Sequence, residues 1–140
     1  MSRHLRIAAA QLGPLNLADT RTSATQRLVK LLREAHGMGA RFVVFPELAF
    51  TTFFPRYWYE DQAEVDRRFF EFTIPSAATQ PLFDEAKKLG IGFYIGYAEL
   101  TQEEGLTRRF NTAILVAPDG SIVGKYRKIH LPGHAEHKPQ

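Results

Sequence analysis

The stretch that most constrains the fold is Arg41–Leu48, which reads Arg-Phe-Val-Val-Phe-Pro-Glu-Leu. A short apolar run rich in β-branched and aromatic residues is typical of a strand buried on both faces. Pro46 lacks the amide hydrogen that a central strand needs, so we expect the strand to end there. Glu47 is then placed at the carboxyl end of a buried strand, where open α/β sheets bind ligands. The alternative is a strand-end residue that only faces water.

The residues before this run predict a βαβ unit. Leu5–Leu12 is predicted to be a first strand, which Gly13 and Pro14 end. Asp19 is a candidate N-cap for the helix that follows, and the glycines at positions 37 and 39 end it. The apolar residues of this helix recur at helical spacing on one stripe: Ala24, Leu28, Leu31, Leu32 and Ala35. Two strands joined by a helix imply parallel pairing and a right-handed crossover.

An aromatic loop, residues 49–60, follows Glu47 directly. It carries Phe50, Phe53, Phe54, Tyr57, Trp58 and Tyr59. Such a loop beside a strand-end carboxylate indicates either a pocket wall or a segment packed back on the core, and both can hold together. Beyond it we expect two helices. One runs from a capped start at Asp61 to Phe72, and the other lies within residues 76–89, with Pro81 in its first turn or at a kink.

The last third of the chain changes to a period of two. Residues 91–98, 110–117 and 121–130 are predicted strands, separated by a loop near residues 103–105 and by a turn at Pro118–Gly120. Strands joined by such short connections are expected to be antiparallel neighbours. The sequence therefore predicts a mixed α/β domain.

Lys128 is the second informative residue. Strand alternation places it on the face of Ile122 and Tyr126, with Lys125 and Arg127 on the other face. If Ile122 and Tyr126 face the core, Lys128 also faces it. A buried lysine needs a partner of opposite charge, for which Glu47 is a candidate. Otherwise Lys128 extends beyond the sheet edge into water. The alternation does not decide which face is buried.

The composition narrows the class of protein. The 140 residues suit a single domain, residues 1–140, with one sizeable core. The net charge of +3 includes no long basic run, which argues against nucleic acid as a partner. The chain has no cysteine, which excludes disulfides and thiolate metal sites. No apolar stretch is long enough for a signal peptide or a membrane span, so we expect a soluble cytoplasmic chain without a membrane partner.

The ordered motifs of this chain resemble the nitrilase superfamily of carbon–nitrogen hydrolases. Phe45-Pro46-Glu47 and the later run Lys125–Pro132 carry that resemblance. Three stretches are similar, more particularly, to the N-carbamoyl-D-amino-acid amidohydrolases of the superfamily: Phe45–Arg56, Gly90–Leu100 and Arg108–Thr112. The resemblance extends over nearly the whole chain, from about Arg6 to His134.

The resemblance implies a fold and a chemistry. The family fold is a four-layer α-β-β-α sandwich, of which this chain resembles the N-terminal half: a mixed sheet with helices on one face. The family catalyses with a Glu, a Lys and a Cys. Glu47 matches the general base, for which a dry pocket can raise the pKa of a carboxylate toward neutrality. Lys128 matches the group that stabilises the oxyanion. The implied substrate is a small N-carbamoyl amino acid or amide, with no cofactor or metal, and the enzyme is expected to be a homo-oligomer.

The chain departs from the family at the nucleophile, which lies downstream of the Lys128 motif. Here there is no cysteine and the sequence ends at Gln140. We therefore expect a truncated form that is inactive alone. The alternatives are a self-associating or partner-binding fragment, and the N-terminal part of another amidase or a β-ureidopropionase. Ser121 has no base nearby in the sequence to replace the thiol, and Pro132–Gly133 argues against a metal site in the histidine-rich tail.

Without the rest of the family fold, the predicted sheet would expose apolar residues to water. We expect these to be Val43, Val44, Phe45, Ile114, Leu115 and Val116. Such a surface predicts poor solubility or self-association.

Overall fold

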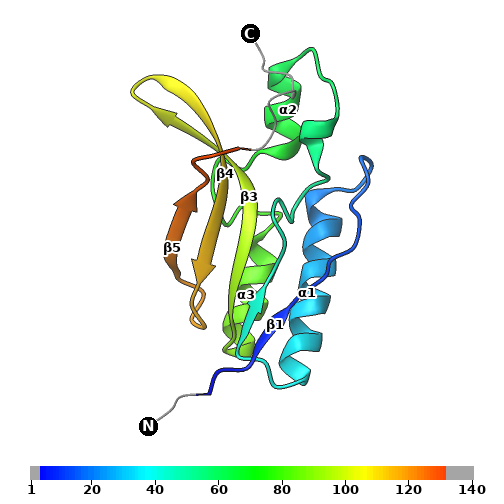
Figure 1. Ribbon diagram of the computed structural model, residues 1–140, viewed down its shortest axis with the longest axis vertical. Helices are drawn as coiled ribbons and strands as arrows, with labels where there is room; N and C mark the ends of the chain where they lie inside the picture. Colours follow the sequence, from blue (N-terminus) through cyan, green and yellow to red (C-terminus); the bar gives the residue numbers. More distant parts are fainter. Residues whose placement is uncertain (1–3, 132–140) are drawn as a thin grey trace.

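The computed structural model describes residues 4–131, which form one mixed sheet with helices on one side (Figure 1). The strands are β1 (Ile7–Ala9), β2 (Phe42–Val44), β3 (Gly92–Glu103), β4 (Leu106–Val116) and β5 (Ile122–Arg127). The helices are α1 (Arg21–Gly37), the 3-10 turn η1 (Phe54–Arg56), α2 (Gln62–Phe69) and α3 (Gln80–Leu89). The strand order is β1-β2-β3-β4-β5. The β1–β2 pair is parallel, as the βαβ pattern predicts, and the β3–β4 and β4–β5 pairs are antiparallel, as the short connections predict. The β2–β3 pair is also parallel.

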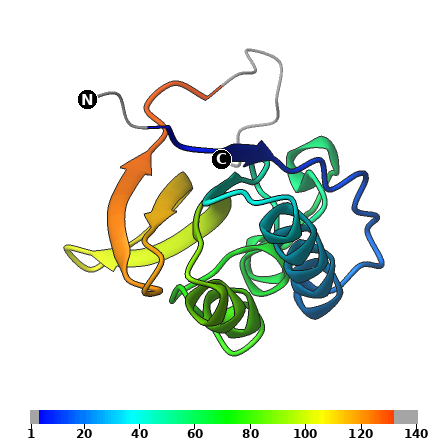
Figure 2. The ribbon, with the colours of Figure 1, turned by 90° about the horizontal axis from the view of Figure 1, so that it is seen from below.

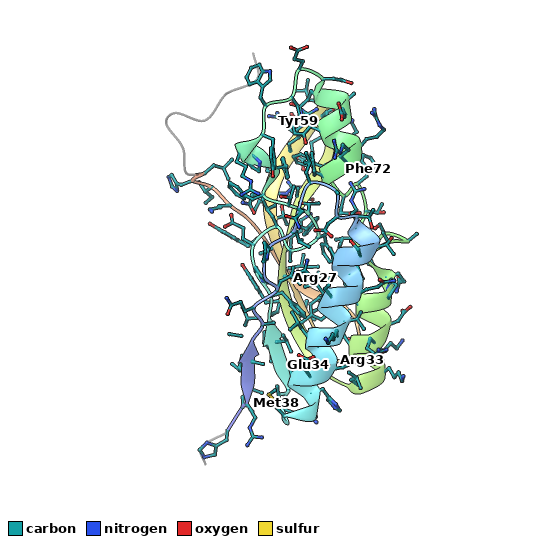
Figure 3. The ribbon with its side chains drawn as sticks, turned by 90° about the vertical axis from the view of Figure 1, so that its right-hand side faces the viewer. Arg27, Arg33, Glu34, Met38, Tyr59 and Phe72 are labelled. Carbon is teal, nitrogen blue, oxygen red and sulfur yellow. The ribbon has the colours of Figure 1, made fainter. Side chains whose placement is uncertain are left out.

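Helices α1 and α3 cover the same face of the sheet (Figure 2). Figure 3 shows this layer beside the sheet, with Arg33 of α1, whose Nε lies 2.9 Å from an Oε atom of Glu85 on α3. The core lies between the sheet and these two helices. Its largest fully buried side chains include Phe45, Phe50, Phe93, Leu28, Leu32, Leu82, Ile91, Ile95 and Ile114. This arrangement confirms the predicted α/β class, with a mixed sheet and helices on one face.

The helix ends agree with the sequence in part. Asp61 caps α2 by accepting from the amide of Ala63 at 2.8 Å, although the helix ends at Phe69 rather than Phe72. The prediction of Asp19 as the N-cap of α1 is wrong. The Asp19 carboxylate instead accepts the amide of Asn16 at 2.6 Å, and Thr20 caps α1 through a reciprocal capping box.

Strand β5 contains a bulge. Val116 pairs with Ile122 but Leu115 pairs with Gly124, so Val123 is an extra residue without an opposite partner. Directly opposed residues of an antiparallel pair share a face, so the bulge places Ile122 and Tyr126 on different faces. The expectation that they share one is therefore wrong, because simple alternation does not continue through an inserted residue.

The face opposite α1 and α3 carries apolar side chains without a covering layer in the described part of the chain. The largest exposed ones are Ile7, Val44, Tyr94, Leu115 and Tyr126. The predicted set of exposed residues is correct for Val44 and Leu115, which are 38% and 40% exposed. It is wrong for the other four, since β-strand alternation turns Val43, Phe45, Ile114 and Val116 toward the helices.

Candidate functional site

Glu47 lies just past the carboxyl end of β2, as the sequence predicts. After Val44 the backbone continues beside β3: the Phe45 amide donates to the Tyr94 carbonyl at 2.9 Å, and the Ala49 amide donates to the Gly96 carbonyl at 2.9 Å. This segment passes so close to Gly96 that a Cβ on that residue would lie 2.9 Å from the Glu47 Cα. Glycine at this position therefore allows the carboxylate to sit over the sheet.

Two side chains from distant parts of the sequence meet at Glu47. The Lys128 Nζ donates to the Glu47 Oε1 at 2.9 Å, although the two residues are 81 positions apart. The Asn111 Nδ2, from β4, donates to the same oxygen at 2.5 Å. Among residues 4–131, all hydrogen bonds to this carboxylate go to Oε1, which leaves Oε2 available to take a proton or a further donor.

The direction of the pKa shift of Glu47 differs from the sequence-based expectation. The side chain is 51% exposed, so the site is not dry within the described residues. The hydrogen bond from Lys128, followed by that from Asn111, holds the pKa of Glu47 below its usual value of 4.5, while burial acts weakly in the opposite direction. The expected raised pKa is thus not found, because two donors stabilise the charged form more than limited burial disfavours it.

Glu47 and Asn111 both line two hollows. One, of about 210 Å³, is mainly apolar and is lined by Phe53, Phe54, Pro55, Phe70, Phe110 and Leu131 beside Glu47. The other, of about 340 Å³, is lined by Tyr94, Tyr126, Lys128 and His130. Both readings of the aromatic loop hold, because Phe50 is buried in the core while Phe53 and Phe54 form the wall of the first hollow.

Asn111 is the site residue that sequence reasoning missed. It lies within the Arg108–Thr112 stretch that carries the family resemblance, which was its only signal. An uncharged amide side chain gives no sequence signal of a catalytic site. Its role depends on a cross-strand position that only the sheet register reveals.

The other candidate residues are not part of this site. The hydroxyl of Ser121 donates to Asp119 at 2.6 Å in the β4–β5 turn, seven positions before Lys128 and roughly 20 Å away along an extended strand. Within residues 4–131 no group of three His, Cys, Asp or Glu side chains is placed to hold a metal. The tail from Pro132, with its histidines, lies outside the described residues. No described helix combines the length and apolarity needed to span a membrane.

Residues 6–140 match the family model of the carbon–nitrogen hydrolases, and the chain belongs to this family, in the nitrilase superfamily. The omega-amidase NIT2 of Danio rerio is 34% identical over 126 residues, which cover 90% of this chain and 40% of that protein. A nitrilase of Pyrococcus abyssi is 35% identical over 130 residues, covering 91% and 44%.

The fold is shared with solved structures. An amidase from Nesterenkonia superimposes with a TM-score of 0.67 at 22% identity, over 95% of this chain and 46% of that one. A carbon–nitrogen hydrolase from Helicobacter pylori gives a TM-score of 0.65 at 24% identity, over 88% and 40%. The chain thus spans less than half the length of the relatives it matches.

Proposed function

We propose that this chain carries the base and the oxyanion-binding group of an amidase active site, which hydrolyses the C–N bond of a small linear amide. The single observation that supports this most is the contact between Glu47 and Lys128, with Asn111 on the same oxygen. The family membership supplies the reaction class. The two hollows that Glu47 lines provide room for a substrate.

The proposed roles follow from the chemistry of the two groups. A cysteine thiol, which this chain does not contain, gives its proton to Glu47, and the thiolate attacks the carbonyl carbon. Lys128 donates a hydrogen bond to the oxygen on which negative charge develops. Collapse of the intermediate breaks the C–N bond, and the leaving nitrogen takes the proton back from Glu47. A water molecule, deprotonated by Glu47, then cleaves the thioester.

The donor geometry suits this sequence of steps. The lysine ammonium has three hydrogens, so Lys128 can keep its hydrogen bond to Glu47 while it donates another to an oxyanion. Asn111 holds Oε1 in place, and Oε2 takes the proton. The negative charge that develops on the oxyanion raises the pKa of Glu47, and the carboxylate becomes a better base.

A narrower proposal names N-carbamoyl-D-amino acids as substrates, with release of ammonia and CO2. Its support is the similarity of the three stretches quoted above. The relatives that match are described as omega-amidase and nitrilase, so the comparisons support the broader amidase class.

Ligand binding to the 140-residue chain tests the proposal. N-carbamoyl-D-phenylglycine and propionamide are titrated into labelled protein while the side-chain amide signal of Asn111 is followed by NMR. Both amides are expected to shift it, and Glu47→Gln is expected to weaken the effect. Glu34→Gln, at an exposed position on α1, is the control. No shift of Asn111 up to the solubility limit of both amides would refute the proposal.

The second candidate is an inactive chain that associates with another copy of itself. It is favoured by the absent thiol and by the exposed apolar face of the sheet. Ammonia release from N-carbamoyl-D-phenylglycine by the purified chain is expected to be absent under both candidates, because the chain has no cysteine nucleophile. Sustained release would refute the assignment of a cysteine-dependent mechanism.

A further inference from the structure

The β4–β5 hairpin contains two conflicting registers. At the turn, Ala117 and Ser121 are joined by a backbone hydrogen bond, and Val116 pairs with Ile122. Continued without interruption, this register would pair Thr112 with Tyr126 and would turn Lys128 toward the helix-covered face. Instead, the bulge at Val123 shifts the pairing by one residue, so that Thr112 faces Arg127. Lys128 then lies on the open face, against Glu47.

Burial of apolar groups does not explain this shifted register. Within Ile122–Arg127 no residue is buried, and Val123 and Tyr126 are 59% and 58% exposed. A strand with no buried side chain has weak register preference of its own. The bulge also leaves one residue unpaired in the ladder. Some other interaction has to favour the shifted pairing.

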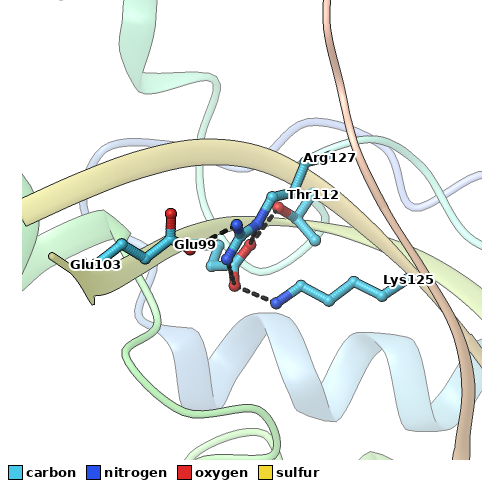
Figure 4. A network of polar contacts seen from close by, with 5 residues as sticks. All are labelled: Glu99, Glu103, Thr112, Lys125 and Arg127. Atoms are coloured by element: carbon cyan, nitrogen blue, oxygen red, sulfur yellow. Dashed lines mark hydrogen bonds and ion pairs between the residues drawn. The ribbon is translucent and has the colours of Figure 1, made fainter.

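That interaction is the ionic cluster around Glu99 on the helix-covered face (Figure 4). Glu99, on β3, is 6% exposed. It accepts hydrogen bonds from Arg127 at 2.9 and 3.0 Å, from the Thr112 hydroxyl at 2.7 Å, and from the Lys125 ammonium. Arg127 also donates to Glu103 at 2.6 Å. In the register set by the turn, Lys125 and Arg127 would both leave this face. Glu99 would then lose the contact of Arg127 with both of its oxygens, and Lys128, opposite Phe110, would be the one cation from this part of the chain on that face.

We propose that Glu99 is a positioning residue: it stabilises the bulged register of β5 and so directs Lys128 toward Glu47 on the opposite face of the sheet. A buried carboxylate that loses both Arg127 and Lys125 is strongly destabilised, so the cluster outweighs the loss of one ladder position at Val123. Glu99 touches neither Glu47 nor the hollows beside it. The inference rests on the proposed function only for the role of Lys128.

Two measurements on the full chain test the positioning role. Cross-strand NOEs report whether Thr112 faces Arg127 or Tyr126. Carbodiimide activates carboxylates, so an amide bond between Glu47 and Lys128, found by mass spectrometry, reports their contact. In Glu99→Gln, the NOE to Arg127 and the cross-link are expected to be lost. Glu85→Gln, which removes the α1–α3 ion pair, is expected to keep both.

A deletion provides the decisive rescue. Removing Val123 makes the register of the turn agree with that of the cluster, since Gly124 then follows Ile122 directly. Glu99→Gln in the chain lacking Val123 is therefore expected to regain the Thr112–Arg127 NOE and the cross-link. A loss of stability alone would not be corrected by shortening an exposed strand.

Each outcome decides the proposal. It is overturned if Glu99→Gln keeps the wild-type NOE, if the deletion gives no rescue, or if Glu99→Gln unfolds both with and without Val123. Should the wild-type chain show the Thr112–Arg127 NOE but no cross-link, the contact behind the proposed function fails. The register role of Glu99 is then still decided by the NOEs.

Discussion

Gly96 is the position at which one methyl group should disturb the site most. A Cβ there would lie 2.9 Å from the Glu47 Cα, 3.0 Å from the Leu48 amide nitrogen and 3.3 Å from the Pro46 carbonyl oxygen. All three are backbone atoms, which cannot move by a change of rotamer. Gly96→Ala therefore has to displace the segment that carries Glu47. Overpacking of this kind costs about 1–3 kcal/mol.

The assay is urea unfolding of Gly96→Ala against the wild-type chain. With a urea slope of about 1–3 kcal/mol per molar, the expected midpoint falls by about 1 M. Gly37→Ala is the matched control, because a Cβ there meets nothing within 4 Å. This control isolates the change in the conformational entropy of the unfolded chain that any replacement of glycine causes. Gly37→Ala is expected to stabilise the folded chain by about 0.4–1 kcal/mol. If Gly96→Ala is as stable as Gly37→Ala, the close approach of Glu47 to β3 is refuted.

Three further predictions follow from the contacts above. Burial disfavours the charged form of Glu99, but the hydrogen bonds from Arg127, Lys125 and Thr112 outweigh it and lower its pKa to about 2. A lowered folded-state pKa contributes stability above the unfolded value of about 4.5, and this is lost as pH falls toward 2. Between those two pH values, the free energy of unfolding of Glu99→Gln should fall less steeply with decreasing pH than that of the wild-type chain. Equal slopes for the two chains would contradict this prediction. Thr20→Ala removes the cap of α1 and should cost about 1 kcal/mol in urea unfolding; no loss would mean that Thr20 does not cap. Leu115→Lys on the open face should shift sedimentation toward monomer, whereas equal association of both forms would exclude that face as the contact.

Much of the fold could be predicted because its signals are local. The helical spacing that ends at Ala35, the apolar run before Pro46 and the turn at Pro118–Gly120 each depend on neighbouring residues. They were sufficient for the βαβ unit, the antiparallel strands and the position of Glu47 at a strand end. The resemblance to the family pointed to Lys128 as its partner.

The details that depend on three dimensions were not accessible in the same way. The bulge at Val123 has no sequence signature, and it interrupts the alternation by which Ile122 was predicted to share a face with Tyr126. The pKa of Glu47 depends on Asn111, which reaches it only through the register of β4. Glu99 resembles any charged residue of a strand until Lys125 and Arg127 are seen to converge on it.

The contact between Glu47 and Lys128 is tested most directly by the NMR titration of the Glu47 carboxyl carbon in the wild-type chain and in Lys128→Met. The geometry predicts a wild-type pKa below 4.5 that rises when the ammonium is removed, because Lys128 is the largest cause of the lowering. Asn111 keeps part of the shift in the variant. An identical pKa for Glu47 with and without Lys128 would contradict the account.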